Sequence, residues 1–247
     1  RVEEPEAYLS EQAIERRAKN GIAVTDADFP ISRSYIDMLS ETGATPVVQS
    51  KWFATVVVES PDSAVAEQLQ QLAIVDSVKW IWKGNLRVPA GEKGEDRFVP
   101  EDEPLHNEYG YAHKQIKMLN GIKLHEAGFR GEGMRVAVID AGFMNADRMS
   151  AFDSLQLLGT HNVVFPGESV FVGDDHGTKV LSCLAADIPG VMVGTAPKAS
   201  YLLLKSEDSD SEYPVEEDYW TAAVEYADSA GVDVISSSLG YFVFDAD

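Results

Sequence analysis

The stretch Met134-Arg-Val-Ala-Val-Ile-Asp140-Ala-Gly-Phe143 decides the fold class of this chain. Its four consecutive apolar residues, Val136 to Ile139, are typical of a strand covered on both faces, as in a parallel α/β sheet. Small residues follow at once, so we expect a turn that leaves Asp140 at the carboxyl edge of the sheet, where catalytic groups collect. The same pattern also fits a dinucleotide site, a phosphoacceptor aspartate or an ordinary strand end. A second motif is needed to choose among them.

That second motif is Asp174-Asp-His176-Gly-Thr178. The residues after it predict a helix that begins at or just after His176 and has Val180, Leu181 and Leu184 on its inward face. An aspartate at a strand end and a histidine on a separate element are two thirds of a nucleophilic triad. In a triad the carboxylate orients the imidazole, and the imidazole takes a proton from a hydroxyl.

Four segments in this chain order resemble the subtilisin-like serine proteases, or subtilases: Val136-Ala-Val-Ile-Asp140, His176-Gly-Thr178, Gly194-Thr-Ala-Pro197 with Ala199, and Ser236-Ser-Ser-Leu-Gly240. The resemblance implies a doubly wound parallel sheet with Asp140 and His176 as catalytic residues. It also implies that Ser238, Leu239 and Gly240 bind the substrate backbone as an added strand. We expect 232–239 to be a buried strand. The hydroxyls at 236–238 are not predicted to be nucleophiles, because the run lacks a strained Gly-x-Ser turn.

The sequence departs from the family pattern in two ways. Lys179 stands where a second histidine is common, and Ala141 follows Asp140 where threonine is usual. More seriously, the 247 residues contain neither a Gly-Thr-Ser nucleophile motif nor an oxyanion motif with asparagine. We therefore expect the front part of a zymogen, which is inert by itself and whose serine lies beyond Asp247.

The N-terminal third predicts a small α+β sandwich, from helices at 10–19, 32–42 and 60–72 and strands at 45–49, 52–58 and 75–82. Placed before a subtilisin-like domain, it resembles the inhibitory prodomain of such zymogens. The implied partners are a peptide or protein substrate and the chain's own prodomain as an intramolecular inhibitor. Expected domains are 1–83, the prodomain; 84–108, a linker rich in Pro, Gly and acidic residues where a maturation cleavage would fall; and 109–247, the first part of the catalytic domain.

The composition of the chain limits the classes of binding partner that we expect. The chain has 41 acidic and 20 basic residues and a formal net charge of −21, which argues against nucleic acid as a partner. No apolar run reaches the length of a membrane span, so we expect a soluble protein without a membrane partner. The start at Arg1, with no Met or apolar leader, fits a secreted or extracytoplasmic protein after signal-peptide removal, or a trimmed chain. Cys183, the single cysteine, is predicted to be a small buried residue.

The sequence predicts no metal site and no certain cofactor. The glycines at 128, 131 and 133 precede the strand, so they do not form a dinucleotide fingerprint. Histidines 106, 113, 125 and 161 lack metal-ligand spacing, and we expect them to be surface or packing residues. The resemblance would allow calcium in 145–173, but that segment has no dense run of oxygen ligands.

Three hypotheses follow, from different classes. The first is a serine endopeptidase precursor that uses Asp140 and His176. The second is a catalytically dead pseudoprotease that binds peptides at 238–240, although such a module would need neither Asp140 nor His176. The third is a non-proteolytic α/β enzyme with Asp140 as phosphoacceptor or nucleophile, which leaves the His176 motif and the N-terminal sandwich without a role. The sequence does not set substrate preference.

Overall fold

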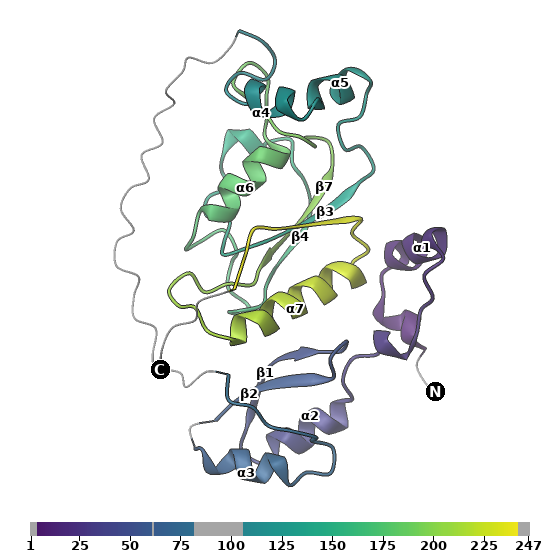
Figure 1. Ribbon diagram of the computed structural model, residues 1–247, viewed down its shortest axis with the longest axis vertical. Helices are drawn as coiled ribbons and strands as arrows, with labels where there is room; N and C mark the ends of the chain where they lie inside the picture. Colours follow the sequence, from purple (N-terminus) through teal and green to yellow (C-terminus); the bar gives the residue numbers. More distant parts are fainter. Residues whose placement is uncertain (1–3, 61, 82–105, 242–247) are drawn as a thin grey trace. The chain divides into compact units, whose positions relative to one another are not determined.

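The computed structural model of the chain describes residues 4–60, 62–81 and 106–241, so most of the predicted linker lies outside the described residues (Figure 1). The chain forms two compact units. The first comprises residues 1–86, 211–231 and 241–247, and the second comprises residues 87–210 and 232–240.

The second unit is built on a parallel sheet of four strands, in the order β4-β7-β3-β8. The strands are β3 (Arg135–Asp140), β4 (Gln156–Asn162), β7 (Ser200–Lys205) and β8 (Val234–Ser237). Helix α6 (His176–Ala185) lies between β4 and β7 in the chain and beside the sheet (Figure 1). This parallel α/β arrangement is the predicted fold class, and β3, β7 and α6 occupy their predicted positions.

Strand β3 is one of the two inner strands of this sheet and pairs in parallel with both β7 and β8. Val136 to Ile139 are each at most 8% exposed, as expected of a strand covered on both faces. Val138 packs in one core cluster with Phe143, Leu181 and Leu203. The sheet and α6 therefore share one hydrophobic core, and this core fixes where β3 ends.

Shorter elements complete the second unit. They are α4 (His113–Met118), α5 (Gly121–Glu126), the 3-10 helix η3 (Ser150–Phe152) and the antiparallel pair β5 (Asp187–Ile188) and β6 (Met192–Val193). Tyr109, Ala112 and Ile116 pack with Val193 in a separate cluster. The segment that precedes β3 is thus attached to the segment that follows α6.

Strand β8 differs from the prediction of a buried strand over 232–239. Val232 is buried, but Val234 is 50% exposed. The physical reason is position: among the described residues β8 pairs only with β3, at the edge of the sheet. An apolar run indicates a strand here, but it does not indicate how many of its sides are covered.

The first unit combines helices with one two-stranded antiparallel sheet. Its elements are η1 (Pro5–Tyr8), α1 (Glu11–Asn20), η2 (Asp26–Asp28), α2 (Arg33–Ser40), β1 (Thr45–Ser50), β2 (Thr55–Glu59), α3 (Ala64–Gln70) and α7 (Val215–Ser229). Ser10 caps α1 as predicted, because the Ala13 N–H donates to its hydroxyl at 3.1 Å. Leu39, Val65 and Leu69 form the small core of this unit.

Two expectations for this sheet are wrong. The second strand begins at Thr55 rather than Trp52, because residues 51–54 form a turn in which Ala54 has a φ of 52°. No strand forms at 75–81 in the described chain, where Trp80 is 56% exposed; Trp82 lies outside the described residues. Instead, the Val78 N–H donates to the Gln70 side chain at 3.1 Å, so α3 holds this segment in a non-strand conformation.

Helix α7 packs on β1 within the first unit, although it follows β7 in the chain. Its buried carboxylate, Glu225, accepts hydrogen bonds from the Ser50 hydroxyl at 2.5 Å, the Lys51 N–H at 3.0 Å and the Trp52 N–H at 3.1 Å. The sequence predicts a helix over 215–230 with Tyr226 on its inward face, but Tyr226 is exposed. The turn after β1 offers polar donors, so the contacting face of α7 carries an acid.

A second polar contact joins α1 to the carboxyl end of α7. Arg17 is only 7% exposed; it donates to Asp28 at 2.6 Å and, together with Arg16, to Asp228. Burial disfavours the Asp28 carboxylate, but hydrogen bonds from Arg17 and Thr25 hold its pKa below the ordinary value. The inward face of α1 is therefore partly cationic.

None of the described helices is both long and apolar enough to cross a membrane.

We expect Glu225→Ala to speed exchange of the Lys51 and Trp52 amide hydrogens by about 10- to 100-fold, since a lost buried hydrogen bond costs about 1–3 kcal/mol. Amide exchange followed by mass spectrometry measures this in the 247-residue chain. Glu217→Ala, at an exposed position of α7, is the matched control and should change neither amide. Unchanged exchange in Glu225→Ala would show that the carboxylate does not hold this turn.

Candidate active site

Asp140 lies at the carboxyl end of β3 and has no exposed surface. Its Oδ1 accepts a hydrogen bond from the Ala141 N–H at 2.8 Å and one from His176 Nδ1 at 2.8 Å. Within the described residues, its Oδ2 has no hydrogen-bond partner. The two residues predicted to be catalytic are therefore brought into direct contact.

Burial dominates the electrostatics of Asp140. It raises the pKa of this carboxyl above its ordinary value. Hydrogen bonds from His176 and Ala141 act in the opposite direction, while the negative charge of Asp174 adds to the increase. The charged form of Asp140 thus lowers the stability of the fold, as is common where a charged group serves a function.

His176 is the first residue of α6, and its side chain is 52% exposed. Because a carboxylate oxygen accepts the bond from Nδ1, this nitrogen carries the proton and Nε2 keeps its lone pair in the neutral ring. One nitrogen is thus fixed by a buried partner, and the ring as a whole remains accessible. Such an imidazole can accept a proton from a substrate or a nucleophile.

Two glycines allow the elements that carry Asp140 and His176 to approach closely. A Cβ at Gly177 would lie 2.4 Å from the Gly142 carbonyl oxygen and 2.9 Å from the Asp140 Cβ. A Cβ at Gly142 would lie 2.8 Å from the Asp174 carbonyl oxygen. The Thr178 hydroxyl then donates to the Met144 carbonyl oxygen at 2.9 Å. This side of the His-Gly-Thr motif is therefore built for close packing.

The predicted substrate segment, Ser238 to Gly240, directly follows β8. The last β3–β8 pair is Ile139 with Ser237, so Asp140 and Ser238 both follow at the same carboxyl edge. Ser238 and Gly240 are exposed and Leu239 is half-buried. The structure places this segment beside the strand end that carries Asp140, and its role in substrate binding stays a prediction.

Other sequence-based expectations have mixed outcomes. Cys183 is exposed, so the prediction of a buried residue is wrong: it lies on the outward side of α6, whose inward face carries Leu181. His125 is buried, with one ring nitrogen 3.1 Å from the Tyr109 hydroxyl and the other 3.0 Å from the Thr195 carbonyl oxygen.

Within the described residues, no group of three or more Asp, Glu, His or Cys ligand atoms gathers in 145–173. Calcium there stays a prediction.

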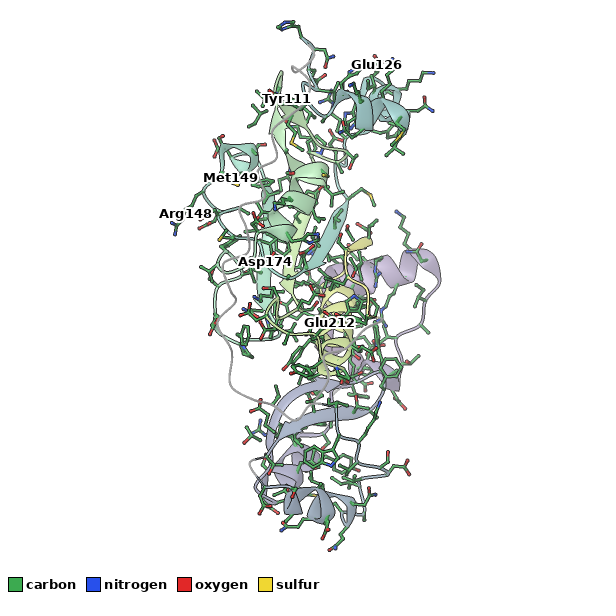
Figure 2. All side chains as sticks on the ribbon, turned by 60° about the vertical axis from the view of Figure 1, so that its left-hand side comes forward. Tyr111, Glu126, Arg148, Met149, Asp174 and Glu212 are labelled. Atoms are coloured by element: carbon green, nitrogen blue, oxygen red, sulfur yellow. The ribbon has the colours of Figure 1, made fainter. Side chains whose placement is uncertain are left out.

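Sequence reasoning assigned no role to Asp174. Its Oδ1 accepts the backbone N–H of His176 at 2.7 Å. Figure 2 shows Asp174 beside the strands of the second unit. An aspartate whose carboxylate accepts the backbone N–H two residues further on forms an Asx turn, and aspartate is one of the residues that favour such turns.

The geometry defines a parallel α/β domain in which the buried Asp140 contacts an accessible histidine, His176. Comparison with known proteins shows what the chain is similar to. Residues 1–96 match the family described as "Peptidase S8 propeptide domain, Bacteroidota". The chain is 31% identical over 133 residues to the "Major intracellular serine protease" of Bacillus subtilis (strain 168), a match that covers 51% of this chain and 40% of that protein. It is 31% identical over 147 residues to "Subtilisin E" of the same strain, covering 58% of this chain and 36% of that protein.

Among solved structures, the chain is similar to the MycP3 protease from the type VII (ESX-3) secretion system, with a TM-score of 0.37 and 22% identity over 49% of this chain and 34% of that one. The chain spans about two fifths of the length of the curated relatives it matches. The propeptide match and the subtilisin matches together support a subtilase with a propeptide domain.

We expect Asp140→Asn to raise the urea midpoint of unfolding at pH 7, because it removes a buried charge and keeps an oxygen acceptor. Since the folded-state pKa of Asp140 is raised, the folded form binds this proton more tightly than the unfolded form does. The destabilisation by the carboxylate is therefore complete above the folded pKa and is lost as pH falls from there toward 3.8, the ordinary value.

The gain in Asp140→Asn should accordingly be largest at pH 7 and shrink toward pH 4. Asp153→Asn, at an exposed position, is the control and should not alter the midpoint. A lower midpoint for Asp140→Asn at pH 7 would contradict this account of the buried carboxylate.

Proposed function

We propose that this chain is the propeptide and front part of the catalytic domain of a serine endopeptidase precursor. The observation that carries the proposal is the 2.8 Å contact between Asp140 and His176 Nδ1 at the carboxyl edge of the sheet. A carboxylate, an imidazole and a hydroxyl are the three groups of the Asp-His-Ser triad. Two of them are present here, and the third would come from a serine outside these 247 residues.

The roles follow from the tautomer of His176. With Nδ1–H bound to Asp140, Nε2 accepts the proton of the attacking serine hydroxyl as the acyl-enzyme forms. The resulting imidazolium is stabilised by the Asp140 carboxylate and then gives its proton to the leaving amine. The same ring next takes a proton from water, and the hydroxide attacks the acyl group to release the product. This sequence requires no cofactor.

Substrate binding is proposed for the edge of the sheet. An extended peptide can add to an unpaired strand edge by main-chain hydrogen bonds. Ser238 to Gly240 continue from β8, which among the described residues pairs with β3 alone. The exposed backbone there would align a scissile peptide bond near the strand end that carries Asp140.

The predicted prodomain, 1–83, is proposed to act as the intramolecular inhibitor. Its match to a peptidase S8 propeptide family supports this role. A cleavage in the linker, proposed for 84–108, would then separate the inhibitor from the enzyme. A secreted or extracytoplasmic location stays a prediction.

The test uses the protein encoded by the complete reading frame and a fluorophosphonate probe, which reacts with an activated serine. We expect labelling and peptide hydrolysis in the unaltered protein. His176→Ala should lower kcat by about 10⁴- to 10⁶-fold, because removal of a triad member abolishes general-base catalysis. His106→Ala, at an exposed position outside the pair, is the control and should retain full activity.

Peptide binding without labelling or hydrolysis would replace this proposal by the peptide-binding module. Labelling that survives in His176→Ala at the original rate would remove His176 from the mechanism.

A further inference from the structure

Asp174 contacts both elements that carry the Asp–His pair. Its carboxylate Oδ1 accepts the His176 N–H at 2.7 Å, and its carbonyl oxygen accepts the Met144 N–H at 2.9 Å. Met144 belongs to the loop that directly follows Asp140. The backbone of Asp174 thus ties the helix start to the loop after β3, and its side chain separately binds the residue that bears the imidazole.

The local packing leaves little freedom for this arrangement. The Asp174 carbonyl oxygen lies 2.8 Å from the point that a Cβ on Gly142 would occupy. The backbone of Asp174 therefore packs closely on the loop that follows β3. This packing does not involve the Asp174 carboxylate, so a substitution of the side chain leaves the backbone contacts in place. The side-chain bond to His176 can be removed without removing the main-chain bond to Met144.

The neighbouring acid, Asp175, makes a different contact. Asp175 precedes α6 directly and makes no side-chain capping bond. Its carboxylate lies 3.2 Å from Lys179 Nζ, one turn along the same helix. The two adjacent aspartates thus differ in their contacts: Asp174 accepts the backbone N–H of His176, whereas Asp175 forms an ion pair with Lys179.

We infer that Asp174 is a positioning residue for His176, which fixes the first residue of α6 by its side-chain acceptor so that Nδ1 stays on Asp140. This inference rests on the proposed function for its catalytic consequence. An imidazole that is 52% exposed is held on one side by the Asp140 contact and at its backbone by this bond. Loss of the backbone bond leaves the Cα–Cβ direction of His176 free to vary, and misplacement of a catalytic group by about 1 Å can cost about 100-fold in rate.

The structural test uses the 247-residue chain and the NMR signal of the His176 Nδ1 proton, which the bond to Asp140 protects from exchange with water. Asp174→Ala should broaden this signal or speed its exchange by about tenfold or more, as expected for a bond that contributes about 1.4 kcal/mol. Asp174→Asn keeps a side-chain oxygen acceptor and should restore the signal. Asp175→Asn removes a neighbouring charge and its ion pair with Lys179 but no bond to His176, so it should match the unaltered chain.

An Asp174→Ala signal equal to that of the unaltered chain would overturn the inference. So would an Asp174→Asn variant that behaves like Asp174→Ala, because the charge rather than the acceptor would then be responsible. Amide protection within α6 shows that each variant keeps the helix.

The catalytic test uses the protein of the complete reading frame. Asp174→Ala should lower kcat by about 10- to 100-fold with KM within about twofold, and Asp174→Asn should recover most of the rate. If the NMR signal responds as expected while His176→Ala leaves peptide hydrolysis unchanged, the proposed function fails and the positioning of His176 stands. If kcat and the NMR signal are both insensitive to Asp174→Ala, the positioning role fails alone.

Discussion

The hydrogen bond between Asp140 Oδ1 and His176 Nδ1 sets the requirements for the second unit. A carboxylate without exposed surface is stable only where donors replace water, and Asp140 has two of them, from Ala141 and His176. Strand β3 must therefore end where the start of α6 can reach it. The rest of this region, including the close contact of Gly142 with Gly177, serves that approach.

The same bond relates stability to chemistry. Burial raises the pKa of Asp140, which means that folding works against the charged form that a triad requires. An apolar residue would suit the core of β3 better, and β3 accordingly carries Val136 to Ile139 up to the last position. Polar residues appear only at the two ends of β3, and Asp140 lies at the carboxyl edge, where a parallel sheet presents side chains to ligands.

The sequence predicted the elements whose signals are local and missed the features that depend on neighbours. Strands β3 and β7 are continuous apolar runs, and α6 has an apolar face at helical spacing after His176, so each could be placed to within a residue or two. The exposure of β8 and Cys183, by contrast, depends on what covers them, which no run of residues encodes. The expected strand at 75–82 failed because its apolar residues resemble a strand, while Gln70 binds the backbone of Val78.

For the candidate site, the contact between Asp140 and His176 could be predicted because both residues occur in short motifs that resemble those of a catalytic triad. The bond from His176 N–H to Asp174 could not be read as firmly, since Asp174 and Asp175 are chemically identical in the sequence. Only the backbone geometry shows that Asp174 accepts the His176 N–H and that Asp175 pairs with Lys179. Helix α7 shows the same limit, because its amphipathic pattern suggested Tyr226 as an inward residue where Glu225 is buried.

The polar character of the contact between α7 and the N-terminal segments has a physical rationale under the proposed function. Glu225 and Asp228 are held by Ser50, Lys51, Trp52 and the arginines of α1 rather than by apolar side chains. If the propeptide is released after cleavage, water can replace these donors on the carboxylates at little cost, because an exposed carboxylate is well solvated. An apolar face in the same place would leave an exposed patch that favours aggregation. Buried carboxylates therefore suit a helix whose partner is temporary, and they account for acidic residues at positions of α7 where periodicity alone predicts hydrophobic ones.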